Sequence, residues 1–326
     1  MADTSPEIAT SVERFQLPAS SLLSPHSRTV GQTINTFWRD LALQLAEADN
    51  DYARAREIYR RWMAPLESAQ RTQYDVNIVE AEIAGRLVDI VTPTARAPLY
   101  TLINLHGGGF VAGDREGARI EAIPIAATAR ARVICVDYRL APEHQHPSAA
   151  EDAAAVLTAL IDSPDAEPVG LFGSSAGALL AAQTIALLIE RDARLPGALG
   201  LFALGASAFP RGDSAHIAGA IEGLTLSEDN LGPYLADAAA TDATAFPFDH
   251  EQTMRRFPAT LLFSSVRDLG LSSVCATHAK LTALNVPAEL HVWEGLRHCF
   301  YYHCDLEESR QAYAAAGRFF ERRLRR

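Results

Sequence analysis

The chain has 326 residues, a formal net charge of −11, 48% hydrophobic residues and 21% charged residues. This composition is typical of a soluble globular protein, and the length suffices for one large domain or two ordinary ones. The only basic cluster is the terminal RRLRR, so no nucleic-acid partner is expected. No run approaches the roughly 18 uncharged apolar residues of a membrane span, so none is expected.

The N-terminus and the cysteines indicate in which cellular compartment the protein resides. Asp3 and Glu7 stand where a secretory signal would carry basic residues followed by an apolar core. The cysteines show no zinc-ligand spacing, so we expect reduced, structural thiols and no metal site. We therefore expect a cytoplasmic protein. The cysteines are Cys135, Cys275, Cys299 and Cys304.

Two helices are predicted before any strand. Residues 1 to about 30 contain three prolines and are expected to form a poorly ordered lead. Apolar residues then recur at helical spacing over 35–46 and again over 51–63. Pro65 is expected to end the second helix. Neither helix can bury its apolar face alone, so the pair should lie across a later part of the chain.

Strands and helices alternate in the rest of the chain. Continuous apolar strands separated by helices predict an α/β fold with a mostly parallel sheet covered on both faces. Because no helix separates the first two strands, the sheet should begin with an antiparallel pair. The predicted strands are 74–79, 87–91, 100–105, 133–138, 169–172, 199–204, 260–264 and 289–293, and the predicted helices are 119–131, 148–161, 176–191, 274–284 and 307–324.

One interval interrupts this alternation. The stretch between Leu204 and Thr260 is too long for an ordinary connection and carries too many aromatic and aliphatic residues for a disordered linker, which is the alternative. We predict that it packs with the N-terminal helices as a lid. The predicted organisation is a helical cap segment over 1–75 and a catalytic domain over 76–326, with a cap insertion at about 205–258.

The stretch VGLFGSSAGALL from Val169 to Leu180 contains a G-x-S-x-G turn between a predicted strand and a predicted helix. That order places the central serine at the carboxyl edge of the sheet, and glycines relieve the crowding of the turn. Ser175 is therefore the candidate nucleophile. A small-residue helix cap or a flexible loop is the alternative interpretation of the same letters.

A nucleophilic serine needs a base and an orienting acid, which follow it in the order Asp or Glu, then His. Asp268 comes just after one predicted strand and His298 comes after the next. The alternatives are an N-cap role for Asp268 and a surface position for His298. His291 lies within its strand and is expected to be a packed core residue, and His303 is a weaker alternative base.

The motif HGGGF begins at His106, directly after a predicted strand. Acyl transfer generates an oxyanion, and glycines allow backbone N–H groups to approach it without steric cost. We assign Gly107 and Gly108 as donors, joined by the N–H of Ala176 at the start of the nucleophile helix. A phosphate-binding loop is the alternative, although neither a Walker lysine nor a complete G-x-G-x-x-G pattern is present.

Taken in order, these motifs resemble the set found in the hormone-sensitive-lipase-like esterases, a branch of the α/β-hydrolases. The similarity runs from about Leu87 to the C-terminus, and the helical N-terminus and the insertion match where that family builds its cap. The motifs are HGGGF from His106, DYRLAPEH from Asp137, GSSAG from Gly173, RDLGLS from Arg267 and EGLRHCF from Glu294.

The resemblance implies an eight-stranded sheet and a cofactor-free carboxylester hydrolase. It also suggests that YRLAPEH forms a scaffold beneath the oxyanion loop, and that a homodimer forms through the last strand and helix. Two positions depart from the family pattern. Ser174 replaces the usual acidic residue before the nucleophile, and S-V-R-D replaces the common D-P-L-x-D around Asp268.

The predicted function is hydrolysis of small acyl esters through an acyl-enzyme on Ser175, with His298 as base and Asp268 as orienting acid. A lactone or an acetylated small molecule is equally compatible with this triad. A binding protein on a hydrolase scaffold is the alternative from another class. Dehalogenase and epoxide hydrolase chemistry is disfavoured, because those reactions place a carboxylate where Ser175 stands.

Aromatic residues of the cap are predicted to form a compact apolar substrate pocket, although packing within the cap is the commoner role of such residues. Cys299, next to the base, would make the enzyme thiol-sensitive if accessible, and a buried inert thiol is the alternative. The aromatic residues are Phe37, Trp38, Phe209, Tyr234 and Phe246.

Overall fold

The computed structural model describes residues 17–164, 166–208, 211–222 and 232–325. Its centre is an eight-stranded sheet with the strand order β1-β2-β4-β3-β5-β6-β7-β8. The expected eight-stranded α/β sheet is therefore confirmed. The strands are β1 (Val76–Ile83), β2 (Arg86–Pro93), β3 (Tyr100–Leu105), β4 (Ala131–Val136), β5 (Val169–Ser174), β6 (Ala198–Phe202), β7 (Thr260–Arg267) and β8 (Ala288–Arg297).

The sheet begins antiparallel, as predicted. Strand β1 pairs antiparallel with β2, and β2 pairs antiparallel with β4. All later pairs, from β4–β3 to β7–β8, are parallel. The carboxyl ends of β3, β5, β7 and β8 therefore meet at one edge of the sheet, where the loops that follow these strands gather.

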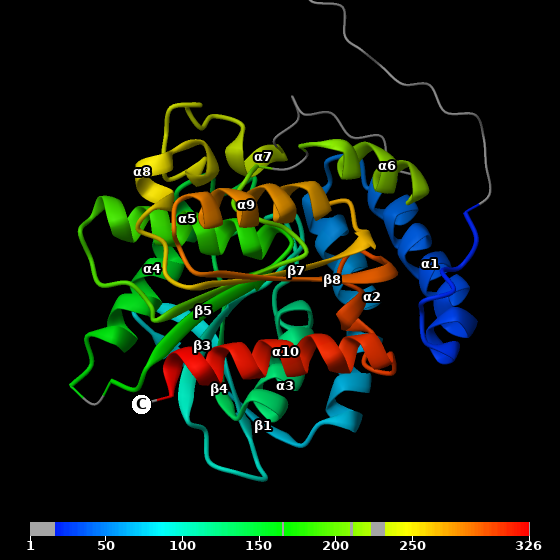
Figure 1. Ribbon diagram of the computed structural model, residues 1–326, viewed down its shortest axis with the longest axis horizontal. Coiled ribbons are helices and arrows are strands. Elements are labelled where there is room, and N and C mark those ends of the chain that lie inside the picture. The colour runs from blue at the N-terminus through cyan, green and yellow to red at the C-terminus, as the bar shows by residue number, and fades with distance from the viewer. Residues whose placement is uncertain (1–16, 165, 209–210, 223–231, 326) are drawn as a thin grey trace, which may run out of the picture.

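Helices cover both faces of the sheet (Figure 1). Every residue of β3 and β5 is buried, as expected for parallel strands that are covered on both faces. Helices α3 and α10 pack together on one face, and α4 and α5 pack together on the other with α9 beside β7. These helices are α3 (Glu116–Ala129), α4 (Ser148–Ile161), α5 (Ala176–Glu190), α9 (Leu271–Ala283) and α10 (Glu307–Leu324).

The first helix starts earlier than predicted. Helix α1 spans Pro25–Ala46, so the expectation of an irregular lead up to about residue 30 is wrong for its last residues. Ser24 is the N-cap, and its side chain accepts a hydrogen bond from the backbone N–H of Ser27. Pro25 occupies the first helical position, where a missing N–H costs nothing. The pair Ser24-Pro25 is therefore a helix start signal.

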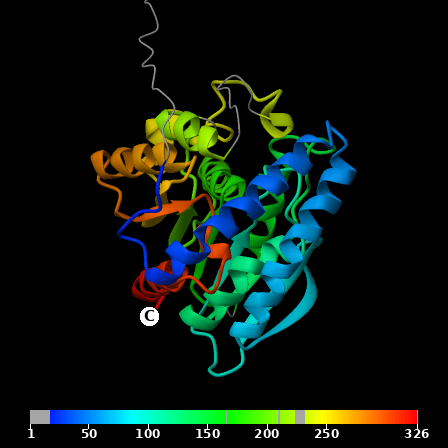
Figure 2. The same ribbon diagram turned by 90° about the vertical axis from the view of Figure 1, so that its right-hand side faces the viewer.

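The second helix ends later than predicted. Helix α2 spans Tyr52–Gln73 and passes through Pro65, so the expectation that Pro65 ends it is wrong. The turns after Pro65 remain helical because they are packed: Glu67 and Gln70 are buried, and α2 lies along α3. Tertiary packing therefore outweighs the local cost of the proline. Figure 2 shows α1 and α2, both in blue, running side by side in front of the sheet.

Short helices occupy the described parts of the interval between β6 and β7. Helix α6 contacts α9, whereas α8 and η1 contact α5, so these pieces lie over the helices on one face of the sheet. The cap boundaries at 1–75 and 205–258 stay a prediction, and Phe209 lies outside the described residues. The pieces are α6 (Asp213–Ile221), α7 (Gly232–Leu235), η1 (Pro247–Asp249) and α8 (Glu251–Met254).

Two further predictions concern the surface. Within the described ranges, no helix is long and apolar enough to cross a membrane. Strand β8 forms one edge of the sheet, which is the position that the expected homodimer through the last strand and helix requires. The homodimer itself stays a prediction.

The turn between β5 and α5 is tightly packed against the end of β3. A Cβ on Gly177 would collide with the carbonyl oxygen of Leu105, and a Cβ on Gly173 would collide with the backbone of Gly177. Both glycines are therefore required by close backbone approach, as the motif suggested.

We expect Gly177→Ala to lower the free energy of unfolding by about 3 kcal/mol or more, because the new methyl group meets backbone atoms that cannot move aside. Chemical denaturation measures this change. Gly31→Ala is the matched control, since no atom of the residues that the structure describes lies within 4 Å of a Cβ there and Gly31 is inside α1. It should be neutral or stabilising by up to about 1 kcal/mol. Equal unfolding energies for the two variants would contradict the packing argument.

Candidate active site

Ser175 lies at the turn that joins β5 to α5. Its backbone has φ 56° and ψ −125°, a conformation that L-residues rarely adopt, and its N–H donates to the carbonyl oxygen of Phe202 at 2.9 Å. The fold holds this strain because the turn is locked between β3 and β6. The serine is thereby raised at the carboxyl edge of the sheet.

The three residues predicted as a triad are joined by hydrogen bonds. His298 Nε2 lies 2.8 Å from Ser175 Oγ, and His298 Nδ1 lies 2.6 Å from Asp268 Oδ1. Loops after β5, β7 and β8 supply the three side chains. The structure therefore brings together residues that are up to 123 positions apart in the chain.

Asp268 is fully buried and rigidly held. Its Oδ2 accepts a hydrogen bond from the Ser264 hydroxyl at 2.8 Å, and its Oδ1 accepts one from the backbone N–H of Gly270 at 2.8 Å. With His298, three donors surround the carboxylate, which offsets the cost of its burial. The sequence did not single out Ser264 or Gly270, because neither belongs to a pattern of its own.

The environment of His298 favours its charged form. Burial of the ring by itself lowers the pKa of His298, but Cys299 and the Asp268 carboxylate outweigh burial and raise this pKa well above 6.5. Of the two, the Asp268 carboxylate makes the direct 2.6 Å contact with Nδ1 of the ring. The site therefore stabilises an imidazolium.

The glycine loop after β3 lies directly beside the serine turn. A Cβ on Gly107 would be 3.0 Å from the carbonyl oxygen of Ser174 and 3.2 Å from Cβ of Ser175. Gly108 has φ +116°, which glycine adopts easily. Ala176 is the first residue of α5, where N–H groups have no intrahelical acceptor. Gly107 and the start of α5 therefore both lie beside Ser175.

The segment YRLAPEH packs beneath this loop, as the family resemblance implied. The Tyr138 hydroxyl donates to the backbone oxygen of His106 at 2.7 Å, and the two rings stack with centroids 4.1 Å apart. The N–H of Ala141 donates to the Phe110 oxygen at 2.9 Å. Burial lowers the pKa of His106 to about 4, so this ring is neutral and structural.

An arginine of α2 ties the N-terminal helices to the same loop. Arg56 Nε donates to the backbone oxygen of Val111 at 2.8 Å, and its Nη2 donates to the oxygen of Ala141 at 2.8 Å. Its guanidinium also pairs with Glu143. No sequence signal identifies Arg56, because all of these acceptors lie more than 50 positions away in the chain.

The aromatic residues predicted to line a substrate pocket fall into two groups. Phe37 packs edge-on against Trp62 at 4.7 Å, and the Trp38 indole donates to His303 Nε2 at 2.9 Å. Tyr234 is almost fully buried and stacks on Phe110 of the glycine loop at 4.3 Å, whereas Phe246 is buried in the core cluster that contains α5. Their role in substrate binding stays a prediction.

The alternative histidines do not reach the serine by any described hydrogen bond. His303 accepts from Trp38, and burial lowers its pKa to about 4. His291 is partly exposed and stacks near Trp293, so the expectation that it is a packed core residue is wrong. Strand β8 is an edge strand, which leaves its side chains only partly covered.

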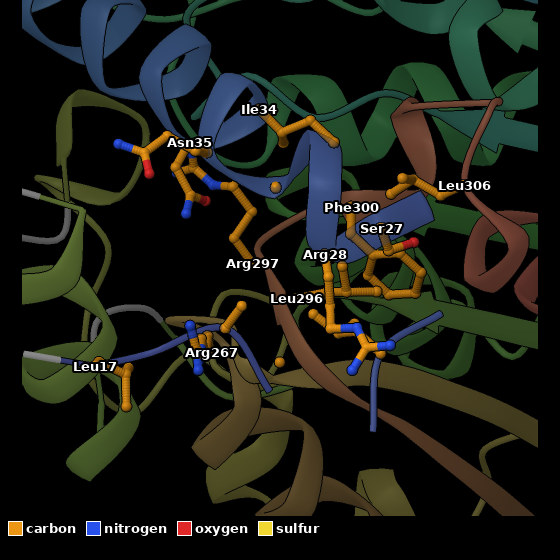
Figure 3. A pocket seen from close by; sticks show the side chains of 15 residues that line it. Leu17, Ser27, Arg28, Ile34, Asn35, Arg267, Leu296, Arg297, Phe300 and Leu306 are labelled. Atoms are coloured by element: carbon orange, nitrogen blue, oxygen red, sulfur yellow. The ribbon is translucent and has the colours of Figure 1, made fainter. Parts of the chain in front are cut away.

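A cavity of about 170 Å³ opens between α1 and the ends of β7 and β8 (Figure 3). Arg267 and Arg297, which directly precede the acid and the base in the chain, both line it. Arg297 forms a nearly buried ion pair with Glu222 and lies over the Trp38 ring at 5.2 Å. These contacts connect the loop that carries His298 to α1 and α6. The sequence alone does not single out Arg297.

We expect Asp268→Asn to lower the pKa of His298. The substitution removes the carboxylate that stabilises the imidazolium, so the ring should take up its proton only at a lower pH. Histidine ring signals followed by NMR across pH measure this, with His298→Asn to assign the signal. Ser264→Ala keeps the carboxylate and should shift the midpoint less. An unchanged midpoint in Asp268→Asn would contradict the assigned contact.

Known proteins are similar to this chain in sequence. A family model described as α/β hydrolase fold matches residues 102–302. The acetyl esterase of Salmonella typhi is 26% identical over 296 residues, covering 85% of this chain and 89% of that protein. The putative acetyl-hydrolase LipR of Mycobacterium tuberculosis is 36% identical over 140 residues, but the match covers only 43% of this chain and 46% of that protein.

Solved structures extend the likeness over almost the whole chain. The crystal structure of esterase E25 has a TM-score of 0.83 and 30% identity, covering 98% of this chain and 100% of that one. An esterase from the bacterial hormone-sensitive lipase family has a TM-score of 0.78 at 22% identity, covering 90% and 97%, which supports the fold. The chain therefore belongs to the α/β-hydrolase family.

Proposed function

We propose that the chain is a serine carboxylester hydrolase that acts on small acyl esters through an acyl-enzyme on Ser175. The observation that carries the proposal is the unbroken hydrogen-bond chain from Ser175 Oγ through His298 to the buried Asp268. Nucleophile, base and orienting acid are within direct reach of one another, as nucleophilic catalysis requires.

In the first half of the reaction, His298 Nε2 takes the proton of Ser175 as Oγ attacks the ester carbonyl. The imidazolium that forms is stabilised by Asp268, which also keeps the proton of the neutral ring on Nδ1. The tetrahedral intermediate then collapses. His298 gives its proton to the departing alcohol, and the acyl group stays on Ser175.

In the second half, water replaces the alcohol. His298 takes a proton from water, and the resulting hydroxide attacks the acyl-enzyme carbonyl. Collapse of the second intermediate returns the proton from His298 to Ser175 Oγ and frees the carboxylic acid. No external reductant, metal or cofactor enters either half.

Charge develops on the carbonyl oxygen in both intermediates. We assign the backbone N–H groups of Gly107, Gly108 and Ala176 as its donors, because the glycine loop and the start of α5 converge beside Ser175. One donor of this kind typically contributes a factor on the order of 10² to 10³ in rate. The N-terminal end of α5 adds its partial positive charge.

Two observations favour a small acyl group. The related proteins of Salmonella and Mycobacterium are named as an acetyl esterase and a putative acetyl-hydrolase. The Phe110 ring that follows the oxyanion glycines stacks on the buried Tyr234, and we infer that this pair narrows the acyl site. An acetylated small molecule or a lactone would react through the same steps.

We expect Ser175→Ala to lower kcat for p-nitrophenyl acetate by at least about 10⁴-fold without lowering the melting temperature. A fluorophosphonate probe should label the wild type and not the variant, because only an activated serine reacts. Ser68→Ala, at an exposed position on α2, is the matched control and should retain full activity. Wild-type protein that neither hydrolyses the ester nor takes the label would instead indicate a binding protein.

We expect kcat/KM to fall by at least about tenfold between p-nitrophenyl acetate or butyrate and the decanoate, because an acyl site narrowed by the Phe110–Tyr234 pair would exclude a long chain. Initial rates across the series of acyl lengths measure this profile. Tyr234→Ala, which uncovers Phe110, should flatten it. A wild-type maximum at decanoate would exclude a small acyl pocket.

A further inference from the structure

A second buried carboxylate lies beneath the nucleophile turn, which is the G-x-S-x-G turn from Gly173 to Gly177. It takes no part in the reaction as described. Glu121 of α3 is fully buried. The Asn104 side-chain amide donates to its Oε1 at 2.7 Å, and the Ser174 hydroxyl donates to its Oε2. Both partners are uncharged. Ser174 is the residue directly before the nucleophile.

The same network reaches the loop that carries the base. The Tyr301 hydroxyl donates to Ser174 Oγ at 2.7 Å and is also fully buried. Tyr301 lies in η2 (Phe300–Tyr302), which follows His298 after one residue. Glu121 therefore accepts from a chain of two hydroxyl groups that links the residue before the nucleophile to the segment after the base.

Retaining a charge in this place is unfavourable for stability. Burial raises the pKa of Glu121 from 4.5 to about 7, although hydrogen bonds from Ser174 and Asn104 act to lower it. The Glu121 carboxyl group is therefore ionised more readily in the unfolded chain than in the folded chain. The free energy of unfolding falls as the pH rises from about 4.5 towards 7.

The other titratable groups around Glu121 are uncharged at neutral pH, because burial raises the pKa of each of them. They come from α2, β4, the loop after β4, η2 and α10, and are Tyr59, Cys135, Tyr138, Tyr301, Tyr302 and Tyr313. Above about pH 7, Glu121 is therefore the charged member of this group. A charged acceptor strengthens the hydrogen bond from Ser174.

We propose that Glu121 is a positioning residue: through Ser174 and Tyr301 it fixes the strained turn of Ser175 relative to the loop of His298. The inference rests on the proposed function. It also accounts for the departure at Ser174, since the carboxylate that position 174 lacks is supplied by α3. The 2.8 Å contact between Ser175 Oγ and His298 Nε2 depends on both segments.

The test is Glu121→Gln, assayed on p-nitrophenyl acetate at pH 8. We expect kcat to fall between about 10-fold and 100-fold, since small displacements of reacting groups are costly, and KM to change by less than about twofold. The melting temperature should stay equal or rise, because a buried charge is removed. Among the described residues Asn104 Oδ1 has no hydrogen-bond partner, so the amide of Asn104 can rotate to accept from the new glutamine.

Rescue separates positioning from general packing. In the double variant Glu121→Gln with Ser174→Asp, a carboxylate again lies between position 121 and the Tyr301 hydroxyl, and we expect kcat to recover to within about threefold of the wild type. Glu308→Gln is the matched control: Glu308 is a buried carboxylate on α10 whose described hydrogen bonds come from Ser24 and Ser27, at the start of α1, and not from the nucleophile turn. It should lower the melting temperature and leave kcat unchanged.

Two results would overturn the inference: wild-type kcat in Glu121→Gln, or a loss of kcat that follows a loss of melting temperature and is not recovered in the double variant. Failure of the proposed function would look different. In that case the wild type itself would show neither ester hydrolysis nor fluorophosphonate labelling.

Discussion

The packing of the turn after β5 against the end of β3 is the constraint on which the site depends. Gly177 approaches the carbonyl oxygen of Leu105 so closely that no side chain fits between them. This contact holds Ser175 at a positive φ and sets the glycine loop beside it. The position of the nucleophile and the position of the backbone donors are therefore set by a single contact.

The parallel order of the strands places Asp268 and His298 beside the nucleophile. Because β5, β6, β7 and β8 are successive neighbours, the loops after β7 and β8 reach the same edge as Ser175. Asp268 is buried there with three hydrogen-bond donors around it, so its charge is directed at one ring nitrogen of His298. A rigid acid is what keeps the imidazole in one tautomer and one orientation.

Two buried carboxylates flank the nucleophile turn with different partners. Asp268 faces the ring of His298, whereas the described hydrogen-bond donors to Glu121 are neutral. Hydrogen bonds also connect the loops of the site to the N-terminal helices. Arg56 binds the backbone of the glycine loop from α2, and Trp38 binds His303 from α1, so the N-terminal helices are mechanically connected to both sides of the site.

The sequence by itself determined the sheet, the five later helices and the triad candidates, because these depend on local periodicity, on turn glycines and on chain order. It failed at the start of α1 and at Pro65 in α2, where packing on α3 keeps the turns helical. Only the tertiary structure decided the contacts of Glu121 and Arg56. Apart from Glu143, their partners are uncharged side chains or backbone atoms, and all of them lie 17 or more positions away, so they leave no pattern in a sequence.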